Sequence, residues 1–525
     1  MRLAAAAALA SAAAMQAGAA TLTVCSAAPP DGFDPTQFTS STTRDMAGFP
    51  IYDQLLSVKR GTSELAPGLA QRWEASADGR QITLHLRRDV AFHTTPWFKP
   101  TRAMNADDVL FSLQRLIDAT RTPKASPWLA SAKAGFEAWA SNGLGELVTG
   151  IEKLDAQTVR IALARPSAPF LALLADDKIA TVFSAEYGAA LLKNGRVEEL
   201  NTQPVGTGPW LFKSYQKDAV LRLAAHPGHW AGKPAIDQLV FAMTPDGKVR
   251  AQRVKAGECL VGSYMRAEAI EAFKGTTVRL LGGPVLITSY ILVNTRRRFL
   301  SDPRFREALW LGIDKKSYVA SVYGGRAEVA NSFLPSVMWG HDASLERAFD
   351  PERAKALVKA SGYDGAPITL SMAVGGSIDG KRAGELLQAD WARIGVKLKV
   401  EMVEWGELLR RTARGDYDLS HLNQGNGADP DSMLTPDLSC GAVASGGNRS
   451  GWCDRRLDEL LDRARVTADR DERAALYRRA QRIVFDAVPV IPTVYPHYYT
   501  AVSAKVKGFV PGPLSDLDFR GVSLD

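Results

Sequence analysis

The stretch AGELLQADWARIGVKLKVEM, residues 383–402, decides the fold class of this chain. Its first part places Leu387, Trp391 and Ile394 at helical spacing, on one face of a predicted helix. Its second part alternates apolar and polar residues from Val396 to Met402, which is the period of a strand. A helix that runs directly into a strand predicts an α/β lobe, in which helices cover a sheet of parallel strands.

The same alternation continues on both sides of this stretch. An apolar strand is predicted at residues 287–293, and Asp302-Pro303 and Asp350-Pro351 each supply an N-cap and a first-turn proline for a helix. The second of these helices should stop at Gly362, because glycine accepts the left-handed conformation that ends many helices. Two more helices are predicted over 454–465 and 470–485, before the chain becomes extended again.

Residues 20–283 mix strands and helices without an internal repeat, which excludes solenoids and propellers. Strands are predicted at 21–24 and 82–87, and Asn105 is predicted to cap a helix. The last thirty residues look like strand and turn and are too few for a domain. We therefore expect them to return to the first lobe.

Length and composition describe a globular protein of two to four domains or lobes. The chain has 525 residues, of which 46% are hydrophobic and 23% charged, and this excludes disordered, collagen-like and multi-span membrane classes. The formal net charge of +7 is small for such a length. The one compact basic run, Arg296 to Arg298, has no interleaved aromatic residues, so we expect no nucleic-acid partner.

Residues 1–19 are predicted to be a cleaved signal peptide. Arg2 gives a positive start, an Ala-rich apolar run follows, and Ala17-Gly18-Ala19 supplies the small residues of a cleavage site. The run is too short for a transmembrane helix, so we expect an exported protein without membrane insertion. Lipid attachment at Cys25 is disfavoured because Val24 precedes it.

Four cysteines, Cys25, Cys259, Cys440 and Cys453, allow three disulfide pairings in an oxidising compartment. Closing the short loop between Cys440 and Cys453 is the easiest step, and it leaves Cys25 to pair with Cys259. The alternative is four buried free thiols. No metal site is predicted, since there is no CxxC motif and the only close histidine pair, His226 and His229, lies in a Pro-Gly loop that should be exposed.

A series of short motifs along the mature chain carries a family resemblance. They are Pro67-Gly68-Leu69-Ala70, Leu84-His85-Leu86-Arg87, Asn105-Ala106-Asp107-Asp108-Val109, Pro204-Val205-Gly206-Thr207-Gly208-Pro209, Asp302-Pro303-Arg304-Phe305-Arg306, Asp350-Pro351-Glu352-Arg353-Ala354 and Val506-Lys507-Gly508-Phe509. Their order resembles that of peptide-type extracellular solute-binding proteins, family 5. Residues 97–102, WFKPTR, and the four cysteines look most like the dipeptide-binding and Sap-type antimicrobial-peptide-binding groups, and that likeness implies the two disulfides named above.

The resemblance implies a two-lobe periplasmic binding protein of type II, with an α/β architecture and a hinged ligand cleft. After the signal peptide, lobe I would comprise residues 20–283 and 494–525, with an extra subdomain inserted at about 56–200. Lobe II would comprise residues 284–493. The two crossovers, near residues 283 and 494, would act as the hinge.

The resemblance also implies a function. The protein would be the periplasmic substrate-binding component of an ABC importer, a monomer that captures a di- or short oligopeptide and hands it unchanged to an inner-membrane permease, without a cofactor. The alternatives are a Sap-type protein for antimicrobial peptide or haem, and a secreted hydrolase. The sequence holds no GxSxG, HExxH, GxxxxGK[ST] or GxGxxG motif, although a pair of catalytic carboxylates would be visible only in three dimensions.

Dipeptide binders of this family hold the ligand's ammonium with an Asp and its carboxylate with an Arg. Alignment on Asp429-Pro430-Asp431 places Asn426 at the Asp position, and residues 372–379, at the Arg position, hold no arginine. Lys381 or Arg382 could reach the carboxylate instead, or could be the solvated start of the next helix. These changes favour neutral or acidic short peptides over free dipeptides.

Other cleft residues are implied by position in the family. The polar loop Thr39-Ser40-Ser41-Thr42 would lend backbone and hydroxyl groups to the ligand, or else be a surface turn. Trp405 would lay an apolar face on the ligand at the cleft edge, or else pack between the lobes. Asp429 and Asp431 are expected to cap turns and helices around Pro430 rather than touch the ligand.

Overall fold

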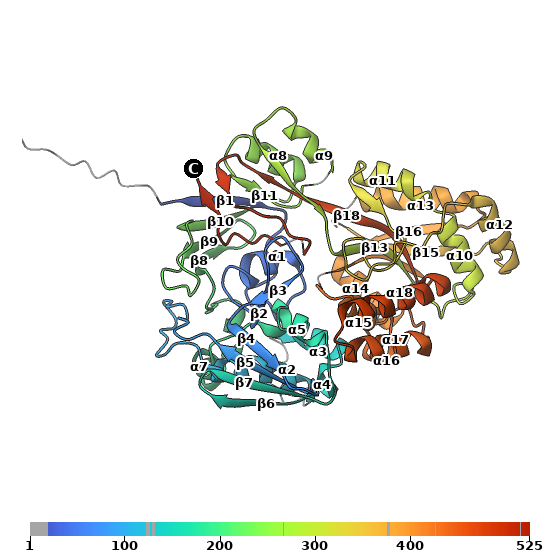
Figure 1. Ribbon diagram of the computed structural model, residues 1–525. Coiled ribbons are helices and arrows are strands. Elements are labelled where there is room, and N and C mark those ends of the chain that lie inside the picture. The colour runs from blue at the N-terminus through green and yellow to red at the C-terminus, as the bar shows by residue number, and fades with distance from the viewer. Residues whose placement is uncertain are drawn as a thin grey trace, which may run out of the picture.

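The computed structural model describes residues 19–121, 126–128, 132–265, 267–374, 379–425, 427–514 and 516–525, so the predicted signal peptide lies outside it except for Ala19. Two α/β lobes lie side by side, and a long strand passes from one to the other (Figure 1). We call the body that holds the first strand lobe I and the other lobe II.

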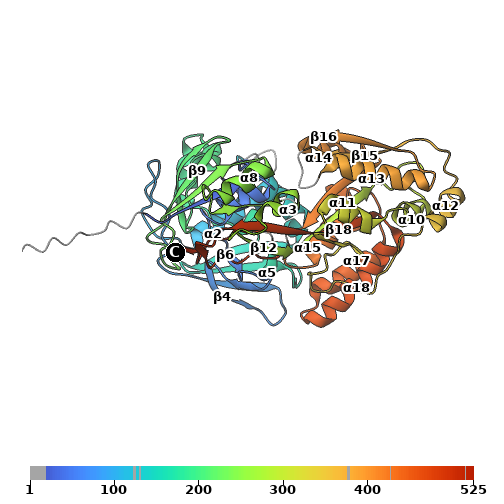
Figure 2. The same cartoon turned by 90° about the horizontal axis from the view of Figure 1, so that it is seen from above.

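One mixed sheet runs through both lobes. Among the described residues it has twelve strands, in the order β16-β15-β17-β13-β18-β11-β1-β10-β9-β8, with β12 and β14 also paired to β18. The central strand β18 (Val490–Val502) pairs with β13 in lobe II through its first half and with β11 and β12 in lobe I through its second half. Figure 2 shows the same strand crossing between the lobes from above. The sheet therefore physically connects the two bodies.

In lobe I the strand β1 lies between β10 and β11 and is parallel to both. Leu22 of β1 and Val522, near the end of the chain, belong to one hydrophobic core. The elements of this part are β1 (Thr21–Ser26), α1 (Ser41–Thr43), η1 (Arg44–Gly48), β8 (Trp210–Gln216), β9 (Val220–Ala225), β10 (Gln238–Met243), α8 (Gly247–Lys255), β11 (Val261–Gly262), α9 (Ala267–Ile270), η4 (Glu271–Phe273), β12 (Arg279–Pro284), β19 (Val506–Lys507) and β20 (Ser523–Leu524).

An inserted part of lobe I, between η1 and β8, forms its own antiparallel sheet in the order β4-β5-β7-β6. Its buried side chains join the core of the rest of lobe I, so we infer that the two move as one body. Its elements are β2 (Leu56–Val58), β3 (Leu65–Pro67), β4 (Ala70–Ala75), β5 (Gln81–Leu86), α2 (Ala106–Arg121), α3 (Lys133–Ser141), α4 (Leu144–Leu147), β6 (Val148–Asp155), β7 (Thr158–Leu163), α5 (Phe170–Leu173), α6 (Asp177–Ala180), α7 (Ala185–Lys193) and η3 (Val197–Asn201).

In lobe II helices cover both faces of the sheet, with separate cores on each. The prediction of parallel strands is right for β15, which is parallel to β16 and β17, and wrong for β13, which is antiparallel to both neighbours. The elements are β13 (Ile287–Val293), α10 (Pro303–Leu311), α11 (Lys315–Tyr323), β14 (Ala327–Val329), α12 (Pro351–Ala360), β15 (Ile368–Ala373), α13 (Gly380–Arg393), β16 (Leu398–Val403), α14 (Trp405–Arg414), β17 (Leu419–Gly425), α15 (Asp431–Leu438), α16 (Cys440–Ser445), α17 (Arg455–Val466) and α18 (Arg470–Ala487).

Local capping explains where these helices begin and end. The Asp350 carboxylate accepts the Arg353 backbone N–H at 2.9 Å, and Gly362, just after α12, has a φ of 70°. Asp302 likewise accepts the Arg304 N–H at the start of α10. The predicted strand at 287–293 and both Asp-Pro helix starts are confirmed.

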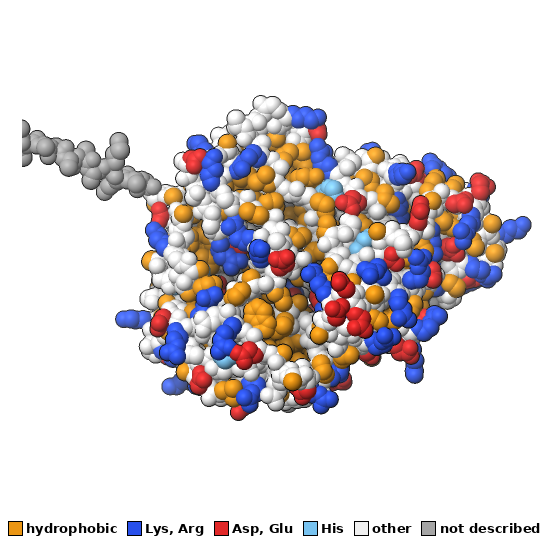
Figure 3. All heavy atoms as spheres, in the orientation of Figure 1, with side chains coloured by type: hydrophobic (Ala, Val, Ile, Leu, Met, Phe, Trp, Pro, Cys, Tyr) orange, Lys and Arg blue, Asp and Glu red, His pale blue; other side chains and the backbone are white. Residues whose placement is uncertain are grey.

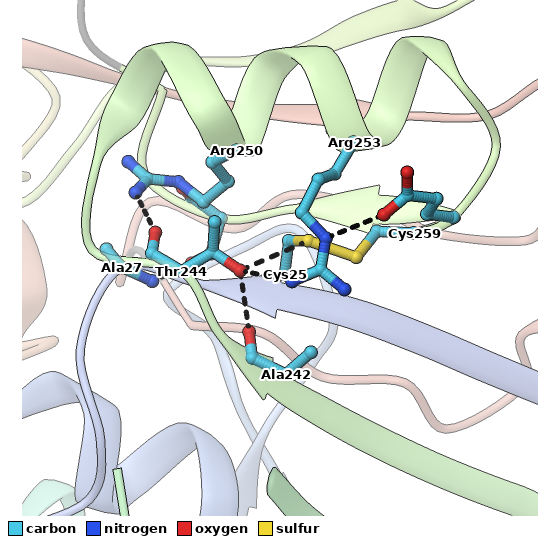
Figure 4. The surroundings of a disulfide bond; sticks show 9 residues. Cys25, Ala27, Ala242, Thr244, Arg250, Arg253 and Cys259 are labelled. Atoms are coloured by element: carbon cyan, nitrogen blue, oxygen red, sulfur yellow. Dashed lines mark hydrogen bonds and ion pairs between the residues drawn. A yellow bond between two sulfur atoms is a disulfide. The ribbon is translucent and has the colours of Figure 1, made fainter. Parts of the chain in front are cut away.

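Both predicted disulfides are present. Cys25 at the end of β1 bonds Cys259, just before β11, with their Cα atoms 5.7 Å apart. Figure 4 shows this bond beneath α8, with the Thr244 hydroxyl 3.5 Å from the Cys25 sulfur. Cys440 at the start of α16 bonds Cys453, just before α17.

The predicted exposure of His226 and His229 is wrong. Each is 6% exposed, and the ring of His226 lies 4.8 Å from that of His93, edge to face. The Gly208 carbonyl lies within hydrogen-bond distance of both His93 and His226. The Asp53 carboxylate lies 3.7 Å from the His229 ring, so each of the two loop histidines has a buried polar neighbour from a distant segment, which local sequence does not reveal.

No helix in the described ranges is both long and apolar enough to cross a bilayer, and no group of three or more His, Cys, Asp or Glu in them could hold a metal ion. On the face drawn in Figure 3, basic and acidic side chains are interspersed over both lobes.

Candidate ligand cleft between the lobes

Parallel strands of both lobes end before the segments that hold the predicted site residues, and Gly427, just after β17, lines a pocket at the boundary between the lobes. In lobe II, β15, β16 and β17 end at Ala373, Val403 and Gly425, and in lobe I, β1 ends at Ser26. In open α/β sheets ligands bind outside the carboxyl ends of parallel strands. The predicted site residues all lie in segments that follow such ends, which makes this boundary the candidate cleft.

In the loop 39–42, two residues make hydrogen bonds that fix the loop conformation and two are exposed to solvent. The Ser40 hydroxyl accepts the Thr43 backbone N–H at 3.3 Å and so caps α1, and the Thr42 hydroxyl donates to the Pro29 carbonyl at 2.9 Å. Thr39 and Ser41 are exposed. Thr39 and Ser41 are therefore the side chains that remain accessible to a solute, while Ser40 and Thr42 hold the loop in shape.

A buried acid lies directly behind this loop. Asp45 in η1 accepts a hydrogen bond from the Tyr264 hydroxyl at 2.7 Å and another from the Leu517 backbone N–H at 3.0 Å. Burial raises the pKa of Asp45 to about 7. Tyr264 has a φ of 47°, a left-handed conformation that is uncommon for an aromatic residue. Asp45 thus joins the loop after β1, the segment after β11 and the C-terminal segment at one point.

A cavity of about 260 Å³ lies beside β12 and β18. Its walls include residues of both crossover strands, aromatic side chains and one carboxylate. Among them are Gly283 of β12, Tyr498 of β18, Tyr264, Phe509 and the carboxylate Asp516. The Tyr264 and Tyr498 rings meet edge to face at 5.8 Å. Burial raises the pKa of Asp516. A cavity that combines apolar walls with several polar groups suits a small organic solute.

A smaller pocket, of about 50 Å³, lies between the lobes. Lobe I contributes Asn142, Pro169, Ala172, Leu173, Ala175, Asp176 and Leu514, and lobe II contributes residues 427–432 apart from Pro430. Each of its acids has a basic partner. Asp176 lies 3.1 Å from the Lys178 ammonium, Asp429 lies 2.8 Å from the Arg473 guanidinium, and Asp431 lies 3.1 Å from that of Arg465.

The two lobe II aspartates are fixed by lobe II itself. Asp429 also accepts the Asp431 N–H at 3.0 Å, and Asp431 accepts the Thr435 hydroxyl at 2.8 Å. Burial raises the pKa of Asp429, while the charge of Arg473 acts in the opposite direction. Both carboxylates are therefore engaged in shaping the loop.

The predicted anchor Asn426 lies outside the described residues, as do residues 375–378 of the segment at the Arg position. The described neighbours of Asn426 are Gly425, which ends β17, and Gly427, which lines the interlobe pocket. Lys381 and Arg382 are exposed in the first turn of α13.

Trp405 begins α14, where the Glu404 carboxylate accepts the Gly406 N–H at 2.8 Å. It is 44% exposed. It lines neither of the two pockets described above.

The sequence did not single out Asp45, Tyr264, Tyr498 or Asp516. They lie far apart in the chain and belong to no motif, so only folding brings them together. The one available signal was the position of Asp45 three residues after the predicted loop.

Comparisons with known proteins agree on one family. The model of the middle region of the bacterial extracellular solute-binding proteins, family 5, matches residues 64–445. The di/tripeptide-binding protein 4 of Pseudomonas aeruginosa (strain UCBPP-PA14) is 44% identical over 524 residues, covering 98% of this chain and 97% of that protein.

Two solved structures share the fold over nearly the full length. A dipeptide-binding protein from Pseudoalteromonas sp. SM9913, in complex with Met-Leu, has a TM-score of 0.87 and 30% identity, covering 96% of this chain and all of that one. The ABC transporter-associated periplasmic binding protein DppA of Helicobacter pylori, in complex with the peptide STSA, has the same TM-score and identity and covers 96% and 98%.

Proposed function

We propose, from the premise that this chain belongs to family 5 of the bacterial extracellular solute-binding proteins, that it is the periplasmic peptide receptor of an ABC importer. It captures a di- or short oligopeptide between its lobes and delivers it to an inner-membrane permease. The observation that carries the proposal is the interlobe pocket, whose walls come from two bodies with separate hydrophobic cores.

The mechanism is closure about paired crossovers. The chain leaves lobe I along β12 and returns along β18. We infer from this that lobe I comprises residues 20–283 and 494–525 and lobe II residues 284–493. Two adjacent crossovers allow the lobes to rotate and restrict their translation. Closing removes the solute and both walls from water, and this burial together with hydrogen bonds supplies the affinity.

The exposed hydroxyls of Thr39 and Ser41 and the amide of Asn426 supply hydrogen bonds to the peptide, and Trp405 lies at the edge of the cleft. An amide at position 426 accepts a hydrogen bond from the ligand's ammonium without offering it a charge, which weakens this contact relative to a carboxylate. The protein acts as a monomer, needs no cofactor and changes no bond in the peptide.

Calorimetric titration tests the proposal. The sample is protein that has first been unfolded and then refolded. Met-Leu and the tetrapeptide STSA serve as probes. We expect at least one to bind with a Kd of micromolar or tighter, about 8 kcal/mol or more. Absence of heat with both peptides would contradict a role in short-peptide capture.

Mass spectrometry of the solute released from the native protein on denaturation gives an independent result. A peptide of unchanged mass supports a transport receptor. Recovery of haem or a sugar would overturn the peptide assignment, and peptide fragments that accumulate during incubation would indicate a hydrolase.

A further inference from the structure

The inserted part of lobe I touches lobe II directly. Its helix α3 contacts α16, and Figure 1 shows the cyan helices of this part against the red helices of lobe II. Five residues of this part between Pro169 and Asp176 and five residues of lobe II between Gly427 and Ser432 line the small interlobe pocket. At the same boundary the Ala168 backbone N–H donates a hydrogen bond to the Arg465 carbonyl at 2.7 Å. The inserted part is thus placed to take part in closure.

The hydrogen bond joins the Ala168 N–H and the Arg465 carbonyl, which without each other would have to hydrogen-bond to water. Arg465 is the next-to-last residue of α17, and the last four carbonyls of a helix lack partners within it. These carbonyls also carry the negative end of the helix dipole, which favours a donor. When the lobes separate, both the amide and the carbonyl return to solvent, so this bond is made by closing the clamp.

The side chain of Arg465 connects this contact to residues 427–431, which follow the predicted anchor position in the sequence and which we call the anchor loop. Its guanidinium lies 3.1 Å from the buried carboxylate of Asp431, which follows the Gly427 to Asp429 segment of the pocket wall. Arg465 therefore makes both contacts: its backbone carbonyl accepts the hydrogen bond from lobe I, and its guanidinium pairs with Asp431 of the anchor loop. A peptide that orders this loop would also order the end of α17.

We propose that the inserted part of lobe I closes against lobe II, and that the hydrogen bond from the Ala168 N–H to the Arg465 carbonyl holds the two lobes in the closed state. We call this hydrogen bond the latch. Arg465 is a positioning residue for it. This inference rests on the proposed function and extends it. It assigns a closing role to the inserted part and predicts that the latch controls how long a captured peptide stays bound.

Substitution of Ala168 tests the latch. Ala168→Pro removes the N–H, in a segment that already contains Pro166 and Pro169, while the control Ala168→Gly keeps it. Stopped-flow kinetics with Met-Leu should show dissociation three- to tenfold faster in Ala168→Pro, with an unchanged association rate, because a lost hydrogen bond acts after capture. Dissociation of Ala168→Pro at the wild-type rate would overturn the latch.

Substitution of Arg465 tests the positioning role. Arg465→Met keeps the backbone carbonyl and removes the partner of Asp431, whereas Arg465→Lys keeps a positive charge there. We expect faster dissociation in Arg465→Met and at least partial rescue in Arg465→Lys. Equal rates in the two variants would show that the ion pair has no positioning role.

Amide hydrogen exchange separates this inference from the proposed function. With Met-Leu bound, exchange of the Ala168 amide should be slower in the wild type than in Arg465→Met, and equal exchange would count against the latch. Failure of the proposed function would show instead as an absence of peptide binding by the wild type.

Discussion

An amide stands at position 426, where dipeptide binders of this family are expected to hold a carboxylate. Its described neighbour Gly427 lines the pocket between the lobes. The charged partners around that pocket are already matched in pairs, so a ligand's ammonium gains little from them.

Asn426→Asp should therefore tighten the binding of a free dipeptide. A hydrogen bond to a charged acceptor is roughly twice as strong as a neutral one, so we expect a gain of about tenfold in Kd for Met-Leu by calorimetry. N-acetyl-Met-Leu, which lacks the ammonium, is the control and should gain nothing. An unchanged Kd for Met-Leu would contradict the placement of residue 426 at the ammonium.

Asp437 gives a second prediction at this scale, for stability. Its Oδ2 is buried and finds no hydrogen-bond partner among the described residues, and burial raises its pKa to about 7, against the charge of Arg449. A carboxyl with a raised folded-state pKa contributes stability that is complete below the unfolded pKa of about 4 and is lost as pH rises through 7. Asp437→Asn removes this dependence.

Urea unfolding across pH measures the difference. At pH 8 the Asp437→Asn variant should be more stable than the wild type by up to about 4 kcal/mol, and the difference should shrink as pH falls and vanish below about pH 4. A difference that does not change with pH would show that the carboxyl titrates normally.

Among the elements, the crossover pair β12 and β18 depends on glycine. Gly282 has a φ of 147° and pairs with Tyr499, and a Cβ on it would lie 2.0 Å from the Tyr498 carbonyl oxygen. A Cβ on the neighbouring Gly283 would meet nothing within 4 Å. The close approach of the two crossover strands is therefore possible only with glycine at position 282.

Gly282→Ala should disrupt this pairing and Gly283→Ala should not. We expect Gly282→Ala to lower the free energy of unfolding by about 2 kcal/mol or more and Gly283→Ala by less than about 1 kcal/mol, as measured in urea. Equal stability of the two variants would mean that the crossover strands separate without cost.

For the whole molecule, the separate cores of the two lobes imply that a ligand acts by bringing them together. Met-Leu at a concentration of 100 Kd should stabilise the protein by about 2.7 kcal/mol. X-ray scattering should show a smaller radius of gyration with Met-Leu than without it, while an equimolar mixture of free Met and Leu should leave the envelope unchanged. An identical envelope in all three samples would contradict closure.

Much of the fold could be predicted because its signals are local. The periodicity of residues 383–402 predicted a helix and then a strand, and the structure has α13 and β16 there. Asp302, Asp350 and Gly362 marked helix ends through capping, which involves neighbours a few residues apart. Strand direction was predicted less well than strand position. The composition of β13 is that of a buried strand, and it is the same for parallel and for antiparallel neighbours.

The sequence by itself determined the helices that carry capping signals or clear periodicity, the family and the pairing of the cysteines, all of which depend on short patterns or on their order. Only the tertiary structure decided which polar groups meet. Asp45 lies 219 residues from Tyr264 and 472 from Leu517, and His226 turned out to be buried against His93. The contact between Ala168 and Arg465 also exists only once the lobes are folded and placed together. The physical reason is that burial and hydrogen bonding between distant segments depend on the position of the backbone in space, which no local spacing encodes.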